Sequence, residues 1–121
     1  MSSIENILRT LGITAKLRGY HYLVTAIKFV TEEEDYLFGI SKNLYPIIAN
    51  IHHTTTSRVD RNIRTALTII WERGNRAYLN ELAGIDLSFR PTAADAIDIL
   101  ASYMRKQQNE EVIPQNKNLS I

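Results

Sequence analysis

Three arginines recur at every third position near the middle of this 121-residue sequence, at Arg58, Arg61 and Arg64. On a helix that turns about 100° per residue, the apolar side chains around them gather on a separate face. These apolar residues are Val59, Ile63, Ala66, Leu67 and Ile70. A guanidinium on the exposed face of such a helix can donate to guanine O6 and N7 together in a DNA major groove. The alternative is an ordinary solvated helix face, which also carries charge.

The segment before the arginine helix predicts a short helix over residues 41–51. Its apolar side chains follow the i, i+3, i+4, i+7 pattern at Leu44, Ile47, Ile48 and Ile51. A short polar connection from His52 to Thr54 or Thr55 comes next. The order of short helix, tight turn and longer helix with exposed arginines predicts a helix-turn-helix over about 41–73. The same periodicity fits any two packed helices.

The start of the arginine helix has several possible caps. Thr55, Thr56 and Ser57 are all side chains that favour the N-cap position. Ser57 and Asp60 also have the spacing of a capping box. Asp60 instead lies four residues before Arg64, where it can form an ion pair that orients the arginine.

Residues 44–75 carry a resemblance to a known family. The matching stretches are Leu44-Tyr45-Pro46, Ile48-Ala49, Thr54-Thr55, Ser57-Arg58-Val59, Arg61, Ile63-Arg64, Ala66, Trp71 and Arg73-Gly74-Asn75. Together they resemble the C-terminal DNA-binding domain of the stage-zero sporulation response regulator, a transcription factor. The resemblance extends over roughly residues 11–105. It implies base contacts by Arg58, Arg61 and Arg64.

At two further positions this chain has a residue type different from the one that is common in the family. The family commonly has Glu at the position of Asp60 and His at that of Thr65. By resemblance we expect both to contact base edges, Asp60 by accepting from cytosine N4. We expect Thr54, Thr55 and Ser57, with the backbone N–H groups at the helix start, to hold phosphate.

The resemblance also implies partners. They are double-stranded DNA with a TGTCGAA-like box, repeated in tandem, and a second protomer bound beside the first through the last helix, where Tyr103, Arg105 and Lys106 should be available. A full-length regulator or RNA polymerase is a further possible partner. Full regulators carry a phosphorylated receiver domain, and 121 residues leave room for one domain only. We therefore expect either a stand-alone effector or a fragment. The alternative function is an interaction module that pairs with a full-length regulator without reading bases.

Charge is distributed unevenly along a chain whose net charge is only +1. Residues 54–76 hold five arginines against Asp60 and Glu72, and residues 9–28 hold four basic residues and no acid. Those four are Arg9, Lys16, Arg18 and Lys28. The acids gather at 32–35 and beyond residue 80. Such polarity allows one basic face on a nearly neutral molecule.

Composition predicts a single globular domain, with 45% hydrophobic and 22% charged residues. There is no cysteine, no secretory signal and no apolar run long enough to span a membrane, so we expect a cytoplasmic protein. The adjacent His52 and His53 are poorly placed to chelate one metal. Without a catalytic motif, we expect no enzyme activity, metal or cofactor.

The whole chain predicts an all-α, six-helix bundle containing the helix-turn-helix. The domain should span residues 1–106, with a first helix capped by a Ser2–Glu5 box and stopped at Gly12. The last helix should run from 92 to 106, capped by Thr92. Residues 107–121 are polar and lack an apolar period, which predicts a disordered tail.

Overall fold

The computed structural model describes the backbone of residues 3–119 and the side chains of residues 3–109. This part of the chain contains seven α-helices, one 3₁₀ helix and no strand. The elements are α1 (Ile4–Leu11), α2 (Arg18–Glu32), η1 (Glu34–Gly39), α3 (Ile40–Asn43), α4 (Tyr45–Ile51), α5 (Thr56–Arg73), α6 (Arg76–Ala83) and α7 (Ala93–Leu119). The predicted all-α class is confirmed, whereas the predicted number of six helices is wrong.

The extra helix arises because the predicted helix over 41–51 is divided into α3 and α4. Pro46 lies in the first turn of α4. It has no N–H to donate to the carbonyl four residues earlier, so the hydrogen-bond ladder breaks there. Leu44 still donates its N–H to the Ile40 carbonyl at 3.0 Å and then accepts from Ile47 at 3.0 Å. A single helix in the sequence pattern therefore becomes two short ones.

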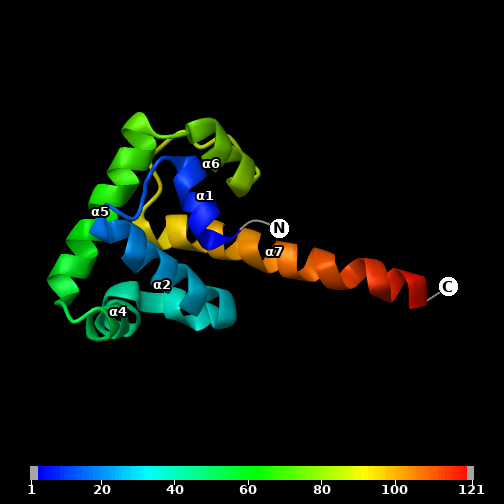
Figure 1. Ribbon diagram of the computed structural model, residues 1–121, viewed down its shortest axis with the longest axis horizontal. Helices are drawn as coiled ribbons and strands as arrows, with labels where there is room; N and C mark the ends of the chain where they lie inside the picture. Colours follow the sequence, from blue (N-terminus) through cyan, green and yellow to red (C-terminus); the bar gives the residue numbers. More distant parts are fainter. Residues whose placement is uncertain (1–2, 120–121) are drawn as a thin grey trace.

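Helix α2 lies at the centre of the fold and packs against α5 and α7, with α1 and α4 also in contact with it (Figure 1). Its residues Tyr20, Leu23, Ile27 and Val30 are buried. Gly19 is required where α2 crosses α5, because a Cβ at this position would overlap the Asn62 backbone carbonyl. This close crossing places the first turn of α2 directly beside α5.

Helix α1 begins and ends with defined caps. Ser3, rather than the predicted Ser2, is the N-cap, and its Oγ accepts from the Asn6 N–H at 3.0 Å. Ser2 lies outside the described residues. Gly12 ends the helix in a left-handed conformation with φ of 114°, as the sequence predicted.

Helix α7 begins as predicted but continues further. The Thr92 hydroxyl accepts from the Asp95 N–H at 3.1 Å, and Ile97, Leu100 and Ala101 are buried. The helix then extends to Leu119, through most of the predicted tail, and projects away from the other helices (Figure 1). Residues 120–121 lie outside the described part.

Among the residues that the structure describes, no helix is both long and apolar enough to cross a membrane.

Candidate nucleic-acid interface

Helix α5 has the orientation that the sequence predicts. Its buried residues are Val59, Ile63, Ala66, Leu67 and Ile70. Arg58, Arg61, Arg64 and Thr65 are all exposed. The apolar face therefore packs into the core, and the arginines are accessible to a partner.

The start of α5 decides between the possible caps. Thr55 is the N-cap, because its Oγ1 accepts from the Arg58 N–H at 3.2 Å. The predicted capping box of Ser57 and Asp60 does not form. Asp60 is instead paired with Arg64, with 2.8 Å between Oδ2 and Nη2, which confirms the expected i, i+4 ion pair. The carboxylate thus orients one of the exposed guanidinium groups.

Residues 52–55 connect α4 to α5 and are held against α2. The Thr54 N–H donates to the Ala49 carbonyl at 2.9 Å, and His53 has a positive φ of 54°. His52 Nε2 lies 2.7 Å from the Thr25 hydroxyl of α2. Burial lowers the pKa of His52, and the neighbouring His21 and His53 lower it further. The connection is therefore anchored to the core near its first residue.

The predicted phosphate-binding residues lie together at the beginning of α5. Thr54 is half-buried, whereas Thr55 and Ser57 are exposed. The Thr55 oxygen is occupied as the helix cap, but its hydroxyl proton remains able to donate.

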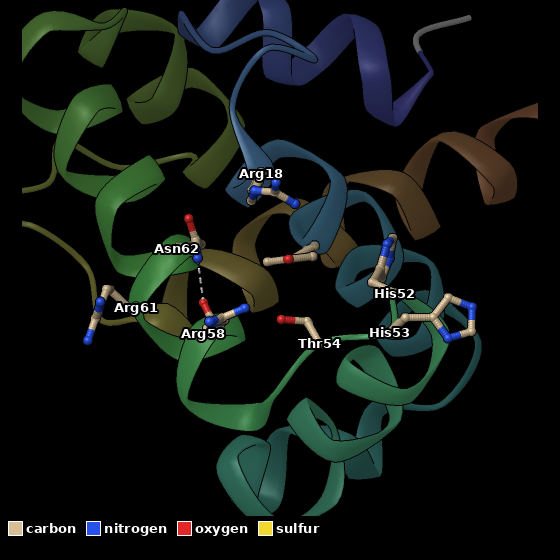
Figure 2. Close-up of a pocket in the computed structure, with 8 residues that line it drawn as sticks. Arg18, His52, His53, Thr54, Arg58, Arg61 and Asn62 are labelled. Atoms are coloured by element: carbon tan, nitrogen blue, oxygen red, sulfur yellow. Dashed lines mark hydrogen bonds between the residues drawn. The ribbon is translucent and has the colours of Figure 1, made fainter.

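His52 and His53 do not face each other (Figure 2). No cluster of three or more metal-ligating side chains occurs in the described residues.

A cavity of about 380 Å³ opens beside this helix start. Its lining residues are Arg18, Tyr22, His52, His53, Thr54, Arg58, Arg61 and Asn62. None of them is acidic. Figure 2 shows Arg18 coming from α2, across the cavity from the connection, while Thr54 and Arg58 point toward each other below it. Sequence reasoning did not assign Arg18 to the site, although the acid-free stretch 9–28 was a signal.

A second hollow, of about 360 Å³, lies toward the other end of α5. Its lining residues are Arg61, Arg64, Thr65, Thr68, Ile69, Arg73 and Arg90. Arg90 comes from the loop between α6 and α7, and its Nη1 donates to the Thr68 hydroxyl at 2.7 Å. Arg61 lines both hollows. The sequence had no signal for Arg90, because only the tertiary fold brings that loop to α5.

An all-helical core with one exposed, arginine-rich helix between two cationic hollows defines a class of domain suited to a polyanionic partner. Comparison with known families identifies the class more closely. The family model of the sporulation initiation factor Spo0A C-terminal domain matches residues 4–104. The chain belongs to this family of DNA-binding effector domains of a sporulation response regulator. It is a family of transcription factors and not of enzymes.

Proposed function

We propose that this protein is a sequence-specific DNA-binding transcriptional regulator in which α4, the connection 52–55 and α5 form a helix-turn-helix. The observation that supports this most is the division of α5 into a buried apolar face and an exposed arginine face. In a helix-turn-helix, the second helix lies in the major groove and the first crosses the DNA backbone. Here α5 would be the second helix and α4 the first.

The exposed residues of α5 would read the bases. Arg58, Arg61 and Arg64 can each donate two hydrogen bonds to a guanine. Asp60 has two possible roles: it orients Arg64 through their ion pair, and it can accept from cytosine N4. Thr65 is exposed on the same helix and can contact either a base edge or a thymine methyl group.

The beginning of α5 would hold the DNA backbone. Thr54, Thr55 and Ser57 carry hydroxyl groups there, and the first N–H groups of a helix attract anions. The helix dipole adds partial positive charge at this end. Such contacts fix the register of α5 in the groove, so that the arginines meet particular base pairs.

By family resemblance, the target would be a TGTCGAA-like box, repeated in tandem and bound by two protomers. We expected Tyr103, Arg105 and Lys106 of α7 to be available for the contact between protomers. For Arg105 this expectation is wrong, because its guanidinium donates to the Val30 carbonyl and to Glu34 of its own fold. Lys106 is exposed. We propose that α7 contacts the second protomer without Arg105.

A binding titration tests the proposal. The protein is titrated against a duplex with one TGTCGAA box, a scrambled duplex of equal composition and a two-box duplex, all at one stated salt concentration. We expect tighter binding to the single box than to the scrambled duplex, and the tightest binding to two boxes in register. Indifference to the box sequence would contradict the proposal.

One observation favours a second function, the interaction module. Helix α4 has no Lys or Arg, and its last residue, Ile51, is 46% exposed. A first helix without basic side chains lacks the charges that attract backbone phosphates, which favours a protein partner over DNA. Under this function the protein would bind a full-length regulator and show no preference for the box.

A further inference from the structure

The cavity beside the start of α5 contains an excess of positive charge. Arg18, Arg58 and Arg61 line it, and no carboxylate is among its lining residues. No ion pair in the described part of the chain involves any of these three arginines. Positive groups that converge on a concave surface raise the local concentration of anions. Arg18, on the α2 side of the cavity, is therefore suited to bind an anionic group that lies beside α5.

Arg18 reaches this cavity because of the helix crossing next to it. Gly19 allows the backbones of α2 and α5 to approach closely at Asn62. Arg18 is exposed at the first residue of α2, and Asn62 donates its side-chain N–H to the Arg58 carbonyl at 2.7 Å. The close approach of the two backbones at Gly19 and Asn62 thus places the start of α2 beside α5. The position of Arg18 relative to α5 is a property of the fold.

Arg90 lies beside α5 as Arg18 does, but toward the other end of that helix. It is exposed, and its hydrogen bond to Thr68 holds it over α5. Arg58 and Thr68 are ten positions apart, which corresponds to about 15 Å along the axis at about 1.5 Å per residue. The major groove of B-DNA is about 12 Å wide. An α5 whose axis crosses the groove would therefore have one of these arginines near each strand.

We propose that Arg18 and Arg90 bind backbone phosphates on either side of the groove that α5 enters. The proposal rests on the proposed function and adds two residues from outside the helix-turn-helix. A guanidinium pairs with two phosphate oxygens at once, which favours Arg at such positions. Because phosphates are the same at every base pair, these contacts strengthen binding to all sequences equally. This distinguishes them from the arginines of α5.

The test uses Arg18→Gln, Arg90→Gln and the double variant, with Lys28→Gln as the matched control. Lys28 is exposed on α2, ten positions from Arg18, and its replacement removes the same charge. Affinity for the box duplex and the scrambled duplex is measured over a series of salt concentrations. Melting temperatures are measured in parallel, because Arg90→Gln also removes the bond to Thr68.

Each arginine variant should weaken binding to both duplexes by a similar factor, of about 3–10. The salt slope, which is the magnitude of the slope of log K against log salt concentration, should fall by about one. The double variant should lower the slope by about two. Lys28→Gln should stay within about twofold of the wild type, as expected for a charge that contacts no phosphate. Wild-type affinity and slope in either variant would overturn the assignment of that arginine. A loss confined to the box duplex would overturn it too, because it would indicate base contact.

A separate titration with inorganic phosphate distinguishes a DNA site from a small-anion site. The amide NMR signals of Thr54 and Arg58 report on the cavity. If the wild type binds neither duplex, the proposed function itself has failed. If in addition phosphate shifts these signals in the wild type but not in Arg18→Gln, the cavity binds a free anion, and the assignment to DNA is overturned.

Discussion

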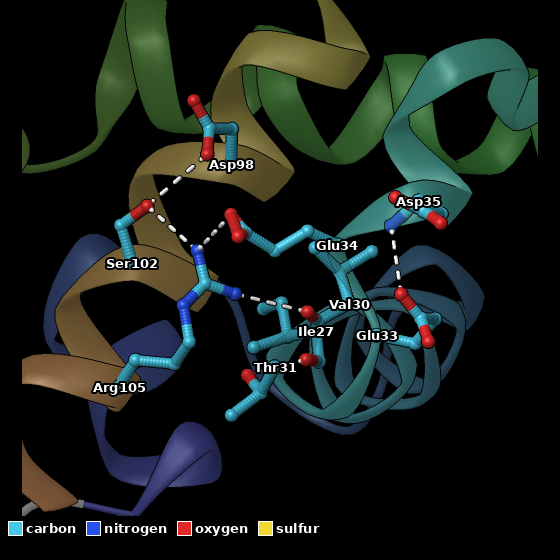
Figure 3. Close-up of polar contacts among 9 residues, drawn as sticks. All are labelled: Ile27, Val30, Thr31, Glu33, Glu34, Asp35, Asp98, Ser102 and Arg105. Carbon is cyan, nitrogen blue, oxygen red and sulfur yellow. Dashed lines mark hydrogen bonds and ion pairs between the residues drawn. The ribbon is translucent and has the colours of Figure 1, made fainter.

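Arg61 of α5 and Arg105 of α7 have opposite surroundings. Figure 3 shows Arg105 enclosed by groups of its own fold: Nη1 donates to the Val30 carbonyl at 3.0 Å, and Nη2 lies 3.3 Å from both Glu34 Oε2 and Ser102 Oγ. Its side chain is 26% exposed. Arg61, by contrast, is exposed and has no ion pair within the described residues.

The difference separates arginines that stabilise the fold from those that can serve a partner. Val30 lies in the last turns of α2, where the carbonyl groups carry partial negative charge, so a cation there is stabilising. Arg105 thereby links α7 to the end of α2 and to η1. The donors of Arg61 have no such use in the fold, and they are available to the acceptors of a DNA groove.

The inner face of α5 should show the largest effect on stability. Ile63 is completely buried. Ile63→Ala should lower the free energy of unfolding by about 2–5 kcal/mol, because contacts are lost and a cavity remains. Chemical denaturation measures this, with the exposed Thr65→Ala as control, which should change it by less than about 0.5 kcal/mol. An unchanged stability for Ile63→Ala would mean that α5 faces the other way.

Arg105 should affect folding and not DNA binding. Arg105→Gln should lower the free energy of unfolding by about 1–2 kcal/mol, since the Val30 carbonyl loses a charged donor. Lys106→Gln is the control, because it removes the same charge from the exposed neighbour. Affinity for DNA should equal the wild-type value at temperatures where the variant is folded. A large loss of DNA affinity in Arg105→Gln with unchanged stability would contradict this assignment, because it would show that Arg105 serves DNA binding and not folding.

Sequence alone predicted the helices that bury an apolar stripe, and it predicted which face of α5 is inside. Those features depend on local periodicity, as at Ile63 and Ile70. It predicted one helix over 41–51, which the structure divides at Pro46 into α3 and α4. It also missed Arg18 and Arg90 in the site, because their positions depend on a helix crossing and on the path of a loop. The internal role of Arg105 was missed for the same reason.

The ion pair of Asp60 and Arg64 should contribute little to stability. The two side chains are 42% and 64% exposed. Asp60→Asn should therefore change the free energy of unfolding by no more than about 0.5 kcal/mol. Its effect on binding to the box duplex should be larger than its effect on stability, since Arg64 loses its orienting partner. Equal affinities for Asp60→Asn and the wild type would remove Asp60 from the site.

The smallest effect should come from pH. Burial lowers the pKa of His52 from its ordinary value of 6.5. Below about pH 6.5 the unfolded chain therefore takes up a proton before the folded one, and stability falls as pH decreases. Above about pH 6.5, the protonation of His52 should not affect the free energy of unfolding. Denaturation across this pH window, compared with His52→Gln, isolates the contribution from those of His21 and His53. An equal pH dependence in the variant would contradict it.

The central claim is that the exposed arginines of α5 read base pairs, and Arg61→Ala tests it most directly. The affinities of the wild type and the variant are measured on the TGTCGAA duplex and on the scrambled duplex at the same salt concentration. We predict a loss of about 1–3 kcal/mol on the box, a smaller loss on the scrambled duplex and an unchanged melting temperature. Equal losses on both duplexes would contradict the claim, because they would show that Arg61 contacts phosphate only.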